Sequence, residues 1–321
     1  MDAPLNSIDV DPAFRADVLA GLSAAIPAIP ARWLYDRRGS ELFEEITKLP
    51  EYYPTRIETG LLHRYSRSVA EVTGHGDAVI EFGSGSSAKT PILLEAVQPS
   101  AYVPVDISGE FLRASAAELK ARFPRLPIYP LEADFMGPIS LPPQVRDVGR
   151  LGFFPGSTIG NMVARTAVDL LRAMKDTLGV GAFLLMGMDR LKDEQVLIRA
   201  YDDADGITAA FNLNLLRRIN VELQGTIPVE AFRHRAIWND RMARIEMHLE
   251  ALRDVDFTVA GQGFRFRAGE TIHTENSHKY GPRDSRLLLH AAGWGVAQEW
   301  TDPDDQFALI LAQAEAPRFA P

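Results

Sequence analysis

The sequence predicts an α/β fold built on a doubly wound parallel sheet, together with a second, smaller α+β domain. Three observations support this prediction. Between residues 77 and 189, short apolar runs bounded by turn residues alternate with segments of helical period. A glycine-rich turn follows the first of these runs directly. The chain has 321 residues, which is too long for one small core and leaves room for two domains.

Five apolar runs are expected to be strands, because continuous apolar runs are typical of parallel strands that are buried on both faces. In chain order they are DAVIEF (77–82), AYVPVD (101–106), PIYPLEADF (127–135), RLGFFPG (150–156) and AFLLMGMD (182–189). Helical periods separate several of them, as in GEFLRASAAELKARF (109–123) and TAVDLLRAMKDTL (166–178). This alternation indicates βαβ units.

The chain on either side of this region has a different character. Residues 1–56 are irregular and helical, with a short amphipathic helix expected to have Ser40 as its N-cap. Residues 193–223 indicate helices, and residues 243–266 alternate roughly, as in a meander or hairpin. The tail at 284–314 has the pattern helix, strand, turn, strand, which suits an antiparallel pair closing the sheet. We therefore predict one domain at 57–192 plus 280–321 and another at 1–56 plus 193–279.

Composition excludes several classes of protein. Apolar residues make up 46% and charged residues 24% of the chain, as in an ordinary globular enzyme, and the net charge is −9. That charge argues against nucleic acid or an anionic membrane as a partner. The absence of cysteine excludes disulfides, thiolate zinc sites and cysteine nucleophiles. The acidic beginning MDAPLNSIDVDPAF is unlike a signal peptide, and no apolar run is long enough to span a bilayer, so we expect a cytoplasmic protein. We also expect a monomer.

The turn VIEFGSGSSAKT places Glu81, Gly83 and Gly85 directly after the first strand. Glycines at this position allow a tight turn and a close approach of the backbone to a ligand. Asp106 ends the next strand, where a carboxylate can accept both ribose hydroxyls of a nucleoside cofactor. A bare strand-to-helix turn and the dinucleotide motif of nicotinamide enzymes, with Ala88 as its third small residue, are the alternatives.

Three features favour S-adenosylmethionine over a nicotinamide cofactor. Glu81 lies two residues before the first glycine, where methyltransferases usually carry an acid. The run ADF at 133–135 is expected to end the third strand, where an acid typically meets the adenine amine. The chain also closes with the expected pair of strands.

Ligands in this fold class bind outside the carboxyl ends of the parallel strands. The loop Gly156–Asn161 follows the fourth strand, so Asn161 is a candidate for binding the substrate, although turns favour asparagine in any case. The loop lacks the Asn- or Asp-Pro-Pro-aromatic run of adenine N-methyltransferases, which again disfavours nucleic acid. Tyr52 or Tyr53 in LPEYYPTR is either a ligand contact or a hydrophobic anchor, and RAYDDADGITAAFN raises the same question for its aromatic residues.

The run GETIHTENSHKY (269–280) is unusually polar. In a strand Glu275 and Ser277 share one face, with Thr274, Asn276 and His278 on the other, and a carboxylate beside a hydroxyl can hold a small heterocycle with two polar nitrogens. A metal site and a solvated loop are the rivals. His273 and His278 are five residues apart, which fits neither one strand face nor a helical i, i+4 pair, so we expect no metal.

Long motifs across nearly the whole chain resemble one family. WLYDRRGSELFEEITKLPEYYPTR, EFGSGSSAKT, FFPGSTIGN, RAYDDADGITAAFNLN, RIEMHLEA and TENSHKY are similar to the histidine-specific Nα-methyltransferases of ergothioneine biosynthesis. The resemblance implies a class I methyltransferase sheet and a substrate-binding domain. It also implies a cytoplasmic enzyme that methylates L-histidine with S-adenosylmethionine, up to the trimethylated betaine hercynine.

Motif by motif, the resemblance also implies the site residues. Tyr52, Asn161 and Tyr201 would hold the carboxylate and amine of the substrate, and Tyr35 and Phe43 would shape the amine end, with Tyr35 and Asn161 as the catalytic pair. Glu275 and Ser277 would hydrogen-bond the imidazole nitrogens, with Met247 near the ring. The cofactor would contact Glu81, Gly83, Ser84, Gly85, Lys89, Asp106, Asp134 and Phe135. The family carries an aliphatic residue at 276 and a small one at 278, where this chain has Asn276 and His278; we expect both to face away from Glu275.

Three other functions stay open at this point. The first is a methyltransferase acting on another amino acid, an amine or a histidine derivative. The second is an NAD-dependent oxidoreductase with the same glycine loop. Such an enzyme would bind NAD, whereas a methyltransferase would bind S-adenosylhomocysteine. The third is a non-catalytic binding partner on a methyltransferase fold, which would bind cofactor without turnover.

Overall fold

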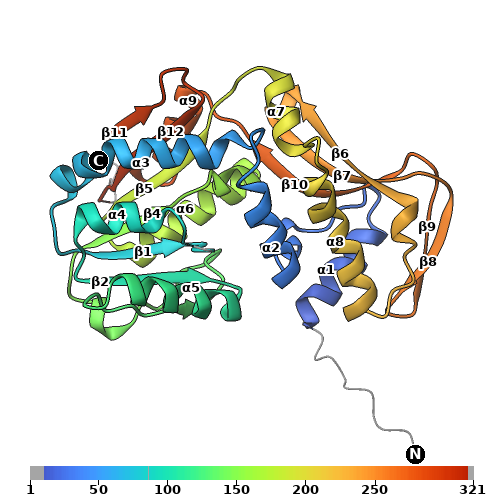
Figure 1. Cartoon of the computed structure of the whole chain (residues 1–321), viewed down its shortest axis with the longest axis horizontal. Helices are drawn as coiled ribbons and strands as arrows, with labels where there is room; N and C mark the ends of the chain where they lie inside the picture. The colour runs from blue at the N-terminus through green and yellow to red at the C-terminus, as the bar shows by residue number, and fades with distance from the viewer. Residues whose placement is uncertain (1–10, 86, 317–321) are drawn as a thin grey trace, which may run out of the picture. The chain divides into compact units, whose positions relative to one another are not determined.

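The computed structural model describes residues 11–85 and 87–316 and divides into two compact units (Figure 1). Unit 1 comprises Met1–Glu51, Glu194–Asp240 and Ile245–Asn276, and unit 2 comprises Tyr52–Asp193, Arg241–Arg244 and Ser277–Pro321. The predicted domains include residues 1–10, 86 and 317–321, which lie outside the described residues. Within the described ranges, no helix combines the length and the apolar character that crossing a membrane requires.

Unit 2 is built on a seven-stranded sheet with the order β11-β12-β5-β4-β1-β2-β3. The strands are β1 (Ala78–Phe82), β2 (Ala101–Asp106), β3 (Leu131–Glu132), β4 (Arg150–Phe154), β5 (Phe183–Asp189), β11 (Trp294–Thr301) and β12 (Phe307–Ala314). Strands β1 to β5 pair in parallel, whereas β12 runs antiparallel to both β5 and β11. The predicted doubly wound α/β fold is therefore confirmed, including the strand pair at its closing end.

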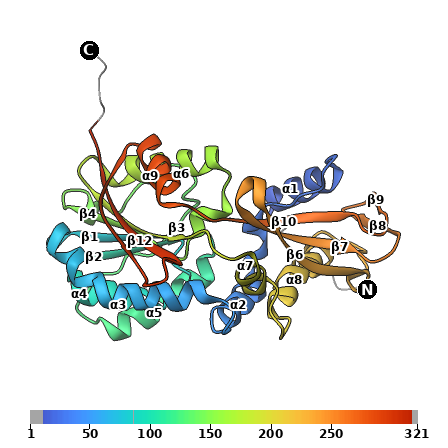
Figure 2. The same ribbon diagram turned by 90° about the horizontal axis from the view of Figure 1, so that it is seen from above.

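Helices cover both faces of this sheet. They are α3 (Tyr53–Thr73), α4 (Thr90–Val97), α5 (Gly109–Arg122), α6 (Ala164–Leu178) and α9 (Pro282–Ala291), with 3-10 turns at Pro143–Val145 and Thr158–Asn161. Ile80 and Phe82 of β1 pack on the side of α6 and α9, while Val79 packs on the side of α3 and α4. Figure 2 shows α6 and α9 on one side of the sheet and α3, α4 and α5 on the other. All five residues of β1 are buried, which explains why its sequence is a continuous apolar run.

Unit 1 combines helices with two small sheets. The helices are α1 (Pro12–Ser23), α2 (Arg37–Ile46), α7 (Glu194–Tyr201) and α8 (Ile207–Glu222), with 3-10 turns at Ala31–Leu34 and Val229–Ala231. A further 3-10 turn, Asp240–Met242, begins in unit 1 and ends in unit 2. The strands are β6 (Phe232–Asn239), β7 (Arg244–Ala251), β8 (Val255–Val259), β9 (Gln262–Phe266) and β10 (Thr271–His278). One sheet has the order β10-β7-β6, and β8 and β9 form the expected hairpin. Strand β10 continues past Asn276, so its last residues belong to unit 2.

The structure corrects two local predictions. Helix α2 begins at Arg37, three residues before the predicted cap Ser40, because the Asp36 side chain accepts a hydrogen bond from the Gly39 backbone N–H at 2.7 Å. Strand β3 ends at Glu132, so Asp134 lies beyond the strand and not within its last residues.

Candidate active site

The glycine turn of unit 2 lies where the sheet order reverses, since β1 has β2 on one side and β4 on the other. Gly83 and Gly85 have φ angles of +69° and +49°, a region that L side chains rarely adopt. The Gly85 N–H donates to Asp106 Oδ2 at 3.0 Å, and the Ser108 N–H donates to Asp106 Oδ1 at 2.9 Å. The structure thus brings the predicted glycines and Asp106 together, and the carboxylate keeps lone pairs for further donors.

The surroundings of this turn fit a bound cofactor. The Ser84 hydroxyl oxygen is buried and has no hydrogen-bond partner among the described residues. A Cβ added at Gly85 would meet nothing within 4 Å, so there is open space beside the backbone. Phe135 packs edge-on against Phe82 and Phe154, with ring centroids 6.2 and 6.0 Å apart. The Asp134 carboxylate accepts the Met136 N–H at 2.9 Å, which fixes the loop that follows β3.

Glu81 points into the fold, and its side chain is buried. Its Oε2 accepts hydrogen bonds from the Thr90 hydroxyl at 2.7 Å and the Tyr102 hydroxyl at 2.5 Å. Burial raises the pKa of Glu81 to about 7, because the ionised form loses hydration that these hydroxyls only partly replace. Its contact with the cofactor stays a prediction.

Lys89 forms an ion pair with Glu58, a carboxylate that is completely buried on α3. Both Glu58 oxygens also accept the Gly156 N–H, at 2.9 and 3.0 Å. Glu58 thus connects the helix after the glycine turn to the loop after β4. Glu58 was not predicted from the sequence; its only signal was an acid on the mostly apolar buried face of a helix.

The loop that carries Asn161 is tied to two other segments of unit 2. Ser157, at φ +57°, accepts the Asp189 N–H on its hydroxyl at 2.8 Å. The Gly160 carbonyl lies 2.8 Å from His278 Nδ1. A Cβ at Gly160 would come within 2.9 Å of the His278 carbonyl oxygen, which explains the glycine. Asn161 is therefore held at the carboxyl end of β4 as predicted from its position, with the end of β10 against its loop.

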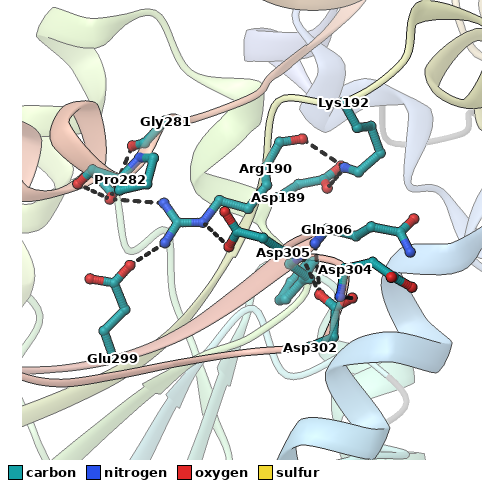
Figure 3. A network of polar contacts seen from close by, with 12 residues as sticks. Asp189, Arg190, Lys192, Gly281, Pro282, Glu299, Asp302, Asp304, Asp305 and Gln306 are labelled. Atoms are coloured by element: carbon teal, nitrogen blue, oxygen red, sulfur yellow. Dashed lines mark hydrogen bonds and ion pairs between the residues drawn. The ribbon is translucent and has the colours of Figure 1, made fainter.

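Asp189, at the end of β5, is buried and has several polar partners, of which Figure 3 shows Lys192. Its carboxylate accepts the Tyr53 hydroxyl at 2.7 Å, Lys192 Nζ at 2.6 Å and Lys279 Nζ at 2.7 Å. Lys279 Nζ also donates to Ser277 Oγ at 2.8 Å. Of the two adjacent tyrosines, Tyr53 belongs to this network. Tyr52, which the resemblance assigns to the substrate, lies at the N-cap position of α3, and its substrate contact stays a prediction.

The residue after Asp189 anchors this end of β5. Arg190 is buried and forms ion pairs with Glu299 and Asp305, and its Nη1 lies 3.4 Å from Ser285 Oγ (Figure 3). These partners belong to α9, β11 and the turn before β12. The antiparallel closing pair of the sheet therefore holds Asp189 in place.

Unit 1 gathers three of the predicted substrate residues. The Tyr35 ring packs edge-on against Phe43 and Phe211, with centroids 5.5 and 5.4 Å apart. The Tyr35 hydroxyl donates to Glu275 Oε2 at 3.4 Å, and Glu275 is buried. A carboxylate thus lies beside an aromatic cluster, an arrangement that suits a cationic or N–H-bearing ligand. Tyr201, at the end of α7, and Met247, on β7, are buried in the same unit.

Asn212 of α8 holds the strand that carries Glu275. Its Oδ1 accepts the Thr274 hydroxyl at 2.7 Å, and its Nδ2 donates to the His248 carbonyl at 3.1 Å. Its Nδ2 also lies 3.0 Å from His234 Nδ1, and burial lowers the pKa of His234. Asn212 was not predicted from the sequence, where its only signal was an asparagine on the buried face of a helix.

Strand β10 departs from simple alternation. Thr274 and Glu275 are both buried, as is Ser277, so the burial pattern shifts by one residue after Thr274. Asn276 is half-buried, and its side-chain oxygen has no hydrogen-bond partner among the described residues.

His273 lies near Glu246 and His248, and the possible ligand atoms of the three are within 4.8 Å of one another. The two imidazole rings stack at 4.7 Å with an interplanar angle of 17°. His273 Nε2 lies 3.0 Å from the Glu275 carbonyl oxygen, and His248 Nε2 lies 3.2 Å from Glu246 Oε2. The absence of a metal stays a prediction.

Comparison with known proteins agrees with this arrangement. A family model described as "Histidine-specific methyltransferase, SAM-dependent" matches residues 14–314. The chain is 41% identical over 306 residues to a histidine N-alpha-methyltransferase of Mycolicibacterium smegmatis, covering 94% of each chain. It is 40% identical over 311 residues to a protein of the same name from Mycobacterium tuberculosis, again covering 94% of each.

A fungal relative shows how the same region occurs in a longer protein. The chain is 29% identical over 298 residues to ergothioneine biosynthesis protein 1 of Neurospora crassa, covering 89% of this chain and 33% of that protein. The likeness to the two mycobacterial relatives and the match to the family model both span nearly all of the chain, across both units. The protein therefore belongs to the S-adenosylmethionine-dependent, histidine-specific methyltransferase family.

Proposed function

We propose that this protein transfers methyl groups from S-adenosylmethionine to the α-amino nitrogen of L-histidine, up to the trimethylated betaine hercynine, in ergothioneine biosynthesis. The observation that carries the proposal is a buried carboxylate beside an aromatic cluster, Glu275 with Tyr35 and Phe43, in a chain that matches the family along nearly its full length. The names of the relatives support the substrate and the pathway.

The cofactor is proposed to bind at the glycine turn of unit 2. Asp106 would accept the ribose hydroxyls, because its carboxylate lies beside the Gly85 N–H and retains acceptor capacity. The remaining proposed contacts are Glu81, Gly83, Ser84, Lys89, Asp134 and Phe135. The buried, unpaired Ser84 hydroxyl supports this placement, since a buried polar group left without a partner costs free energy. The bound cofactor supplies a methyl group carried on a sulfonium.

The contacts with the substrate are part of the same proposal. Glu275 and Ser277 are proposed to hydrogen-bond the two imidazole nitrogens, with Met247 against the ring. The residues proposed to hold the carboxylate and amine are Tyr52, Asn161 and Tyr201. Tyr35 and Phe43 would form an aromatic wall at the amine end, where a growing, finally quaternary ammonium is better accommodated by ring faces than by charged groups.

Methyl transfer requires a neutral amine with a free lone pair. Bound S-adenosylmethionine would supply the methyl group to this lone pair and would keep the electron pair of the carbon–sulfur bond on sulfur. The protein contributes position and electrostatics. In each round that begins from an ammonium, one proton must leave the nitrogen, and we propose that a tyrosine hydroxyl or water passes it to solvent, with Tyr35 and Asn161 holding the amine.

Mass spectrometry tests the substrate assignment directly. The protein is incubated with S-adenosylmethionine and each amino acid in turn, and we expect histidine to gain one, two and three methyl groups while the others gain none. Another amino acid methylated in place of histidine would overturn the proposal and establish the alternative substrate.

Glu275→Ala tests the proposed imidazole contact. Leaving a polar group of the bound substrate unpaired costs roughly 1–3 kcal/mol, so the KM for histidine should rise about 5- to 150-fold. The KM for S-adenosylmethionine should change much less. Unchanged histidine kinetics would contradict the assignment of Glu275.

The finer points of partnership and location are also proposals. We propose that the enzyme acts as a monomer in the cytoplasm on a free small molecule, without nucleic acid or a membrane. The net charge of −9 supports the last point, because both of those partners attract basic surfaces.

A further inference from the structure

Lys279 is a completely buried lysine directly after β10, and its ammonium makes two short contacts within unit 2. Nζ lies 2.7 Å from Asp189 Oδ2 and 2.8 Å from Ser277 Oγ. An ammonium has three donors and no acceptor. The Ser277 oxygen therefore accepts the hydrogen bond from Lys279, and the proton of the Ser277 hydroxyl points away from Lys279.

The Asp189 network fixes the direction of this hydrogen bond. Burial by itself would raise the pKa of Asp189, but the ammonium groups of Lys279 and Lys192 outweigh it and lower the pKa, so the carboxylate is ionised. A buried ammonium is retained where a charged partner offsets its lost hydration. Tyr53 and Lys192 hold the same carboxylate, at 2.7 and 2.6 Å. Lys279 is therefore tied to one position behind Ser277.

We propose that Lys279 is a positioning residue that makes Ser277 a hydrogen-bond donor to the substrate. This inference rests on the proposed function, in which Ser277 and Glu275 bind the two ring nitrogens of histidine. Ser277 then donates to the nitrogen that carries no proton, while a Glu275 carboxyl oxygen accepts the N–H of the other nitrogen. One donor and one acceptor together select a neutral imidazole in a single tautomer.

The charges behind Ser277 act in the same direction. The Lys279 ammonium donates to Ser277 and is therefore a positive charge close to the proposed ring site. Positive charge near a ring disfavours an imidazolium relative to a neutral imidazole. The enzyme therefore discriminates against rings that lack an accepting nitrogen, and Lys279 is the source of that discrimination.

The test compares two substrates in three variants. The substrates are histidine and the analogue of alanine that bears a pyrrole ring, which keeps an N–H and has no accepting nitrogen. The variants are Lys279→Met, Ser277→Ala and their combination. The wild type should have a KM for histidine lower than that for the pyrrole analogue by about tenfold or more. In Lys279→Met the KM for histidine should rise, and the ratio of the KM for the pyrrole analogue to the KM for histidine should fall towards one. Combining Lys279→Met with Ser277→Ala should add little to Ser277→Ala alone.

Lys192→Met is the matched control. It removes the other ammonium on Asp189, whereas the ammonium that donates to Ser277 remains. We expect Lys192→Met to keep the preference for histidine over the pyrrole analogue. If Lys192→Met and Lys279→Met lose the preference for histidine equally, the network acts only as structure and the proposal is overturned. The proposal is also overturned if Lys279→Met keeps the same preference for histidine as the wild type.

Binding of S-adenosylhomocysteine, read as a rise in melting temperature, reports whether each variant is folded. If Lys279→Met does not fold, the same ratio is measured in Asp189→Asn/Lys279→Met, which removes both charges of the buried pair. That variant should also lose the preference, and keeping it would overturn the proposal. A wild type that does not methylate histidine refutes the proposed function itself, whereas methylation with an unchanged preference in Lys279→Met refutes only the role of Lys279.

Discussion

Replacing Glu81 by glutamine should stabilise the protein at pH 8 and leave its stability at pH 5 nearly unchanged. Burial raises the pKa of Glu81 from 4.5 to about 7. The native state therefore keeps a proton between these values that the unfolded chain has lost, so stability falls as pH rises through this window. Each pKa unit corresponds to about 1.4 kcal/mol, which gives a full cost of about 3 kcal/mol above pH 7. Glutamine cannot ionise, and its side-chain oxygen can still accept from Thr90 and Tyr102.

Scanning calorimetry at pH 5, 6.5 and 8 measures this effect, since it can resolve separate transitions of the two units. The melting temperature of Glu81→Gln should exceed that of the wild type by an amount that grows with pH. Glu118→Gln on α5 is the control, because it also replaces a glutamate by glutamine but at an exposed position, where the side chain stays in contact with water. Parallel curves for Glu81→Gln and wild type would refute the reasoning. A separate titration with S-adenosylhomocysteine, expected to show weaker binding by Glu81→Gln, tests the proposed contact with the cofactor.

Three further predictions concern packing and pH. Gly187→Ala should destabilise unit 2 by about 1–3 kcal/mol in thermal denaturation, because the added Cβ would lie 2.2 Å from the buried Glu58 oxygen. Gly60→Ala is the control and should not destabilise the unit, because a Cβ there meets nothing within 4 Å. Equal losses of stability in the two variants would refute the prediction. Asn212→Ala should cost about 1–3 kcal/mol and raise the KM for histidine, since it frees β10 from α8; an unchanged KM would count against it. Burial lowers the pKa of His234 below 6.5, so the stability it contributes is complete above about pH 6.5 and is lost as pH falls below it. Calorimetry between pH 7 and 5 should show this decline, and His234→Gln should show a shallower one; an equally steep decline would contradict the assignment.

The strands of unit 2 were predictable because each is buried on both faces and is therefore apolar throughout. Residues that follow such strands, Gly83, Asp106 and Asn161, could be placed at one edge of the sheet by the general rule for parallel strands. The start of α2 was predicted wrongly because Ser40 and Asp36 are both good caps, and only the backbone decides which one receives an N–H. The third strand was predicted too long, since β3 ends at Glu132 and the last three residues of PIYPLEADF (133–135) belong to a loop.

The sequence by itself determined the fold class, the glycine turn and the set of candidate site residues, because local periodicity and short motifs carry that information. Only the tertiary structure decided which polar groups share a proton or a charge. Tyr53 and Asp189 are 136 residues apart in the chain, and Glu58 reaches Gly156 across 98. Such pairs depend on how helices pack against the sheet, and the free energy of that packing is set by many apolar contacts at once, none of which is visible in the residues that form the pair.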